Sequence, residues 1–210
     1  MHGLRTLFAF DVRALAVFRI ALGVCVLLDV ITRAPDVDAF LTDGGVLPRP
    51  LWFRFVDDTA WSVHAATGSA IGAAFLLAVA ASFACALVVG WHTRIASIAL
   101  LLLTISLQDR NPAVFYGFDL LLRTCLLWSC FLPLDRAFSV TSSNTRAHPH
   151  LFSAATIAFT IQMAAVYAFS GMQKLEQPTW RDLSAGFFAL TADTHATAIA
   201  RFVARSTAAT

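Results

Sequence analysis

Long apolar runs are the feature that most constrains what this chain can fold into. From Ala65 to Gly90 no side chain is charged, and an apolar stretch of about 20 residues is what an α-helix needs to cross the hydrocarbon core of a bilayer. Four further apolar runs cover 14–32, 95–107, 113–134 and 151–169. The chain is therefore predicted to be all-α, a multi-pass transmembrane helical bundle with about five or more spans.

Composition excludes two other classes of protein. Hydrophobic residues make up 58% of the chain and charged residues 13%, whereas a soluble domain carries roughly a quarter charged residues. The net charge of +2 is too small and too dispersed to build the basic face that a nucleic-acid binder needs. The lipid bilayer is thus the expected partner, and nucleic acid is not.

The segments between the runs are polar. We interpret the first run as a retained span rather than a cleaved signal, because no small-residue cleavage pattern follows it. The stretch 33–62 is predicted to be a loop or re-entrant segment, with Trp52 and Trp61 as interface anchors. The stretch 135–150 is predicted to be an exposed loop, and the residues beyond Trp180 are too broken by charges for a further span.

Four charged side chains interrupt the apolar runs. Asp119 and Arg123 are four residues apart, which places them on one helix face, where each can neutralise the other. Arg19 and Asp29 are about 15 Å apart by helix rise and should not pair, although Asp29 can reach Arg33 one turn on. Because a charge at the bilayer centre costs at least about 2.5 kcal/mol, these residues either lock helices together or line a polar or substrate-binding cavity.

Lys174 is the only lysine of the chain and ends the last apolar run. One interpretation is an interfacial lysine whose ammonium group reaches the lipid headgroups. The other is a lysine in an apolar cavity, where lost hydration favours the neutral amine that a general base requires. No cysteine or histidine spacing indicates a metal site, and His64, which stands alone, is expected to be solvated or interfacial.

The abundance of arginine and alanine is typical of a GC-rich bacterial genome, so we expect a multi-pass protein of the bacterial cytoplasmic membrane. Counting arginines in the loops favours neither orientation of the N-terminus.

Five segments, taken in order, resemble a known family. They are 13–23 with Leu28-Asp29, then 42–49, 108–112, 116–117, and 169–175 with Trp180. This order resembles the horizontally transferred transmembrane (HTTM) domain, the membrane domain shared with vitamin K-dependent gamma-carboxylase. The resemblance covers roughly 11–186 and implies one HTTM-like membrane domain over 1–210. Whether the last helices of that domain are present stays open at this point.

The resemblance also implies a chemistry. In the carboxylase, the lysine in the segment that matches 171–175 is regarded as the base that deprotonates vitamin K hydroquinone, and Lys174 falls on it. A reduced quinone of this kind is the cofactor so implied, and a secreted peptide or another membrane protein is the implied partner. The reaction would form a strongly basic alkoxide, remove a γ-proton of glutamate and add carbon dioxide, in a site that excludes water.

The chain departs from the carboxylase at two points. Pro112 follows Asn111 where the carboxylase has a histidine that supports its lysine, and the chain ends soon after the lysine segment. Two hypotheses stay open: a carboxylase-type enzyme with Lys174 as base, or a non-catalytic accessory or maturation factor. Asn111, Arg19, Asp29, Asp119 and Arg123 are the candidate substrate-site or cavity-lining residues. A transporter ranks last, because internal repeats are absent from the sequence.

Overall fold

The computed structural model describes residues 7–56, 60–141, 150–191 and 197. These residues are helical apart from turns and a short two-stranded antiparallel sheet, in which Phe10 pairs with Leu151 and Asp11 with His150. The chain divides into two compact units, 1–157 and 158–210, and each is described by itself. In chain order the elements are β1 (Phe10–Asp11), α2 (Val12–Arg33), η1 (Ala34–Asp36), α3 (Val37–Leu41), α4 (Arg49–Phe55), η2 (Val63–Ala66), α5 (Ala70–Val89), α6 (Thr93–Arg110), η3 (Pro112–Val114), α7 (Gly117–Ser129), β2 (His150–Leu151), α8 (Ala154–Glu176), α9 (Pro178–Arg181) and α10 (Ala185–Thr191).

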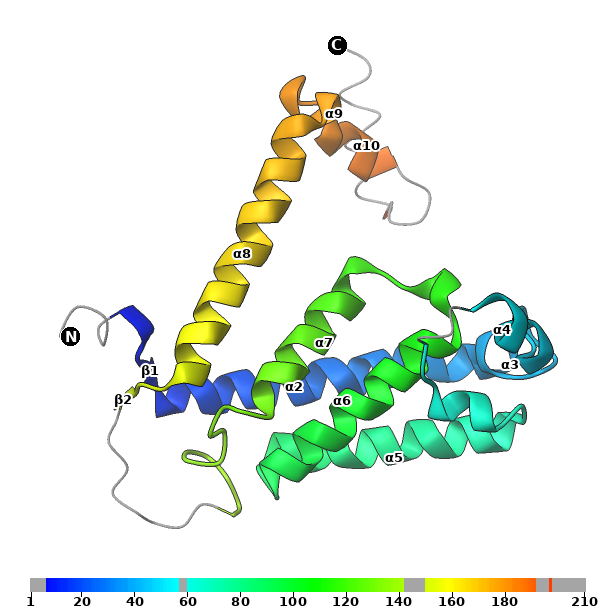
Figure 1. The fold of residues 1–210 in the computed structure, drawn as a ribbon, viewed down its shortest axis with the longest axis horizontal. Coiled ribbons are helices and arrows are strands. Elements are labelled where there is room, and N and C mark those ends of the chain that lie inside the picture. Colours follow the sequence, from blue (N-terminus) through cyan, green and yellow to red (C-terminus); the bar gives the residue numbers. More distant parts are fainter. Residues whose placement is uncertain (1–6, 57–59, 142–149, 192–196, 198–210) are drawn as a thin grey trace. The chain divides into compact units, whose positions relative to one another are not determined.

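The first unit is built on the pairing of α2 with α5 (Figure 1). Asp11 caps α2 by accepting a 2.7 Å hydrogen bond from the backbone N–H of Arg13. Gly23 lies so close to α5 that a Cβ there would stand 3.0 Å from the carbonyl oxygen of Ala84. The small residues at this crossing let the two backbones approach closely, which is the usual basis of helix pairing in lipid.

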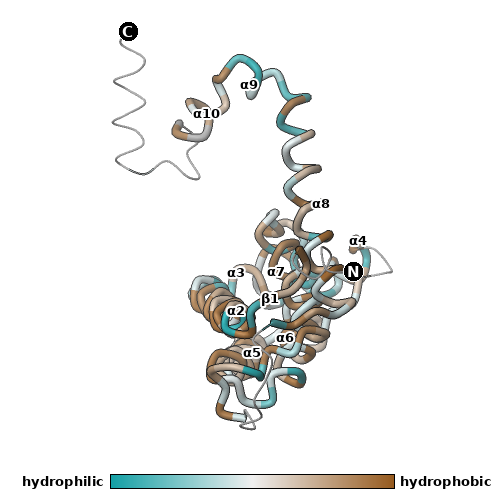
Figure 2. The backbone as a smooth tube through the Cα atoms, turned by 90° about the vertical axis from the view of Figure 1, so that its left-hand side faces the viewer, coloured by the Kyte–Doolittle hydropathy of each residue, from teal (hydrophilic) through white to brown (hydrophobic). Residues whose placement is uncertain are grey.

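Helix α5 has a clear signal at each end. The Ser69 hydroxyl accepts a hydrogen bond from the N–H of Gly72, and Gly90 ends the helix in the left-handed conformation, with φ of 78°. Helix α6 packs on α5 and α7 packs on α6, so that the core consists of leucine, valine and alanine from α2, α3, α5, α6 and α7. Figure 2 shows the hydrophobic colouring that predominates along α2 and α5.

Three helices are long and apolar enough to cross a membrane. They are the run Val12–Leu41, which joins α2, η1 and α3, then Ala70–Val89 and Ala154–Glu176. The chain is thus an all-α protein with three candidate spans within the described residues, and it belongs to the membrane class that its composition predicts.

The other two expected spans are not borne out as full crossings. Helix α6 reaches 18 residues only by including Arg94, Asp109 and Arg110, and these charges remove it from the candidate spans. The run 113–134 is broken by η3, and α7 has 13 residues, which cover only about 20 Å at 1.5 Å per residue. The cap at Tyr116 and the end of α7 at Ser129 therefore shorten what hydropathy alone presents as one span.

The segment 33–62, expected to be a loop or re-entrant stretch, contains η1, α3 and α4. Trp52, expected at the interface, is buried, and its indole N–H donates a 2.9 Å hydrogen bond to the carbonyl of Asp109. Trp61 is about half exposed.

The second unit holds most of α8, followed by α9 and α10. Helix α8 ends at Glu176, and Pro178 then begins α9, where its missing N–H costs no hydrogen bond.

Candidate functional site

The candidate site is a network of charged and amide side chains where α2 ends, α6 ends and α7 begins. We call it the Asp119 network; its members are Asp29, Arg33, Gln108, Asp109, Asp119 and Arg123.

Asp119 is the centre of the network and is 1% exposed. It is the third residue of α7, and its Oδ2 accepts a 2.8 Å hydrogen bond from the N–H of Tyr116, the cap residue. Its Oδ1 accepts from Arg33 Nη2 at 2.7 Å and from Gln108 Nε2 at 3.0 Å. A helix start fixes the carboxylate, and donors from α2 and α6 complete its hydrogen bonding.

Arg33 joins two carboxylates. Its Nε lies 2.9 Å from Asp29 Oδ1, the i, i+4 contact that the spacing predicts, and its Nη2 reaches Asp119 across to α7. The guanidinium is planar and carries five donors, so it can serve two acceptors at once. Arg33 therefore ties the end of α2 to the start of α7.

Arg123 does not pair with Asp119, and the prediction of that pair is wrong. The Arg123 guanidinium instead pairs with Asp109 at 2.5 Å and donates to the side-chain oxygen of Gln108, both on α6. It also lies over the Phe115 ring, 5.3 Å from the centroid. The Asp119 carboxylate caps the start of α7 and is held there by its hydrogen bonds. Arg123, one turn further along α7, therefore pairs with residues of α6.

Three carboxylates and two guanidinium groups leave the Asp119 network with one excess negative charge. The Gln108 amide and the Tyr116 backbone N–H offset part of it by donating to Asp119. The arrangement suits a lock between α2, α6 and α7, because each charged member contacts a partner on another element or one turn away. No group of three or more His, Cys, Asp or Glu within the described ranges could hold a metal ion.

Asn111 and Arg19 lie outside the Asp119 network. Asn111 is buried; its Nδ2 donates to the carbonyl of Phe40 at 3.3 Å, and its Oδ1 accepts from the N–H of Ala113. Arg19 is fully buried, and its Nη2 donates to the carbonyl of Phe138 in the segment after α7. The remaining guanidinium nitrogens of Arg19 have no hydrogen-bond partner in the part of the chain that the structure describes.

His64, which the sequence analysis expects at the surface, is a buried group. Only 1% of it is exposed, its Nδ1 lies 2.7 Å from the Ser106 hydroxyl, and that hydroxyl also accepts from the His64 N–H at 3.0 Å. The expectation of a solvated or interfacial histidine is therefore wrong. Burial, helped by the nearby Arg110 charge, lowers the pKa of His64 to about 4.

This pKa predicts a loss of stability in acid. A histidine that titrates at about 6.5 unfolded and about 4 folded stabilises the fold fully above pH 6.5, and that contribution is lost as the pH falls toward 4. The shift corresponds to roughly 3 kcal/mol. We expect the midpoint of thermal unfolding in detergent, followed by tryptophan fluorescence, to fall across this window, and His64→Gln to flatten the decline. An equally steep decline in the variant would contradict the assignment.

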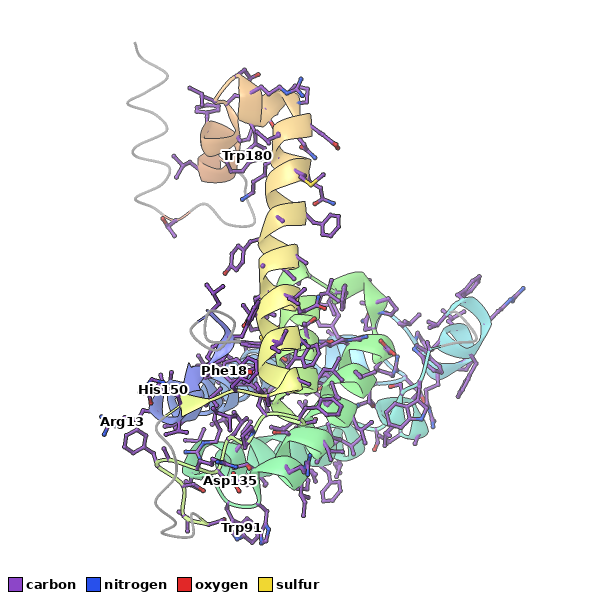
Figure 3. All side chains as sticks on the ribbon, turned by 60° about the vertical axis from the view of Figure 1, so that its left-hand side comes forward. Arg13, Phe18, Trp91, Asp135, His150 and Trp180 are labelled. Atoms are coloured by element: carbon purple, nitrogen blue, oxygen red, sulfur yellow. The ribbon has the colours of Figure 1, made fainter. Side chains whose placement is uncertain are left out.

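Lys174 belongs to the second unit. It is exposed there, and its Nζ lies 4.8 Å from the centroid of the Trp180 ring, the geometry of a cation–π contact. Figure 3 labels Trp180 beside the end of α8. Both interpretations of Lys174, an interfacial ammonium group and an amine in an apolar cavity, stay predictions. Helix α8 supplies the lysine and helix α9 supplies the indole, a pairing that sequence spacing alone does not reveal.

Comparison of the chain with protein-family models, with curated proteins and with solved structures gives no match.

Proposed function

We propose that this membrane protein is an enzyme of the HTTM and vitamin K-dependent gamma-carboxylase type, with Lys174 as the base that accepts a proton from a reduced quinone. The observation that carries the proposal is the single lysine of the chain, placed at the end of a candidate span with its Nζ 4.8 Å from the centre of an indole ring. An aromatic face beside an amine suits a flat, lipid-soluble ring compound as the proton donor. The ordered sequence segments, with Lys174 at the carboxylase lysine, support the same assignment.

In this proposal the Asp119 network and the Lys174–Trp180 pair have different roles. The Asp119 network fixes the helices of the first unit, so that the ends of α2, α6 and α7 keep one arrangement. Lys174 holds and moves the proton, Trp180 orients its amine, and the bilayer supplies the apolar surroundings that exclude water. The quinone, when bound, would supply the oxidative chemistry.

Lys174→Met tests the proposal directly. Protein in vesicles is given reduced vitamin K, oxygen, labelled carbon dioxide and a glutamate-rich peptide, and label in the peptide is counted. We expect incorporation above background for the native protein and background for the variant, because a thioether cannot accept a proton. Arg181→Met, which removes a nearby exposed cation, is the matched control and should retain incorporation. Both variants should have the thermal midpoint of the native protein.

A second function is favoured by the Asp119 network itself. Every charged member of the network has an ionic partner within it, as a helix lock requires, and this suits a non-catalytic accessory or maturation factor. Under that alternative Lys174→Met leaves the phenotype of the host unchanged, whereas a change that breaks the network abolishes function. Equal incorporation by native protein and Lys174→Met would overturn the enzyme proposal.

A further inference from the structure

The segment around α4 exposes large apolar side chains outside the three candidate spans. Phe53 is 69% exposed, Phe55 70% and Val46 69%, and Leu51 and Trp61 are also exposed. We call these five residues the α4 surface. Five exposed large apolar side chains on one short segment between spans call for an apolar neighbour.

The α4 surface is fixed to the end of the helix bundle. The buried Trp52, on the same helix, donates to the carbonyl of Asp109 near the end of α6. The Arg49 side chain pairs with Asp43 at 2.7 Å, and the Asp43 N–H donates to the carbonyl of Gly68 just before α5 begins. Helix α4 therefore lies level with the end of α6 and the start of α5.

Helix rise sets where this level lies in a bilayer. Counted from Val12, about 20 residues of α2 cover roughly 30 Å of hydrocarbon and reach Ile31. Arg33 follows at once, and the Asp119 network connects it to Asp109, the residue that holds Trp52. We therefore place the ion pairs of the Asp119 network and helix α4 at the same depth in the bilayer, the boundary between the hydrocarbon core and the headgroups.

We infer that α4 is an interfacial helix and that the phospholipid headgroup layer is the partner of the α4 surface. The exposed phenylalanines of the α4 surface enter the boundary between headgroups and acyl chains, the depth that the apolar side chains of interfacial helices reach. Arg54 is exposed, and its guanidinium lies 5.6 Å from the Phe55 ring centroid, a position from which it can meet lipid phosphates. A hollow of about 410 Å³, walled by Trp52, Phe53, Val56 and Trp61, offers room for part of an acyl chain.

Nitroxide accessibility in vesicles tests the inference. Phe53→Cys is spin-labelled in a protein whose four cysteines are replaced by alanine, and its collisions with oxygen and with a water-soluble nickel chelate are compared. Phosphatidylcholine–phosphatidylglycerol vesicles with labelled headgroups or labelled chains calibrate depth. We expect a severalfold higher ratio of oxygen to nickel collisions at Phe53 than at Gly44→Cys, an exposed position of the same segment where a Cβ has room, and a depth between the two lipid calibrants.

Phe75→Cys, on an exposed face of α5, is the reference inside the hydrocarbon core and should report the greatest depth. The inference is overturned if the Phe53 label collides with nickel as often as the Gly44 label, since α4 would then be an aqueous loop. It is also overturned if the Phe53 label is shielded from both reagents, since protein would then cover it. A label at Phe55, exposed to the same extent, provides the measurement if the Phe53 variant does not fold.

Discussion

Replacing Arg33 by methionine is expected to destabilise the first unit by about 3–5 kcal/mol, the effect of removing one partner from a buried ion pair. The change leaves Asp29 and Asp119 without their shared guanidinium, and Asp119 is almost fully buried. In a chain of this length such a loss lowers the midpoint of thermal unfolding by on the order of 10 °C. A thiol-reactive fluorescent dye measures that midpoint in detergent in a Cys85→Ala background, because Cys85 is exposed whereas Cys25, Cys125 and Cys130 are buried or half-buried until the protein unfolds.

Two further variants show whether the lower midpoint of Arg33→Met comes from the broken Asp119 network or from the loss of any positive charge. Arg13→Met removes an exposed arginine from the same helix and should leave the midpoint within about 2 °C, as surface substitutions do. Arg33→Met combined with Asp119→Asn should recover part of the loss, because the excess negative charge falls back from two to the native one and a side-chain oxygen that can cap α7 remains. If the double variant were less stable than Arg33→Met by the full cost of Asp119→Asn alone, the two residues would not be coupled.

Replacing Gly90 by alanine is expected to cost about 3 kcal/mol or more, through two separate causes. The φ of 78° at Gly90 is a left-handed conformation that costs an L-residue about 1–2 kcal/mol. In addition, the new Cβ would lie 1.8 Å from Arg19 Nη1 and 2.7 Å from Ser139 Cα. Since Arg19 is fully buried under the end of α5, its guanidinium has no free space to move into.

Gly117→Ala is the matched control for this change. Gly117 begins α7 without a positive φ, and nothing lies within 4 Å of a Cβ built there. The same addition of one methyl group should therefore leave the thermal midpoint unchanged or slightly raised. Equal midpoints for the two alanine variants would show that the contact of Arg19 with the end of α5 does not constrain the fold.

Helices α2 and α5 follow directly from the sequence, because hydropathy and end signals agree. Ser69 and Gly90 border the apolar run of α5 as cap residues, and Asp11 does the same for the start of α2. The predicted first span ends at Thr32, one residue before α2 ends at Arg33. Where burial and capping act together, the sequence therefore predicts the helix to within a few residues.

The middle of the chain was harder to predict for a physical reason. Hydropathy treats 113–134 as one run. It carries no information on the 3-10 turn that ends at Val114, on the Tyr116–Asp119 cap that starts α7, or on the end of α7 at Ser129. The i, i+4 rule pairs Asp119 with Arg123, yet the rule describes an isolated helix surface, and tertiary donors on α2 and α6 take precedence. His64 carried no local signal, because its burial depends on Ser106, 42 residues away.

The central claim is that the apolar helices cross a bilayer, with the Asp119 network at one edge of its hydrocarbon core. Extraction of membranes from expressing cells with alkaline carbonate tests it most directly, because this treatment strips proteins held only at the surface and leaves spanning helices embedded. We expect the protein to remain in the membrane pellet and to dissolve only when detergent is added. Recovery of the protein in the carbonate supernatant, as a monomer soluble without detergent, would contradict the claim.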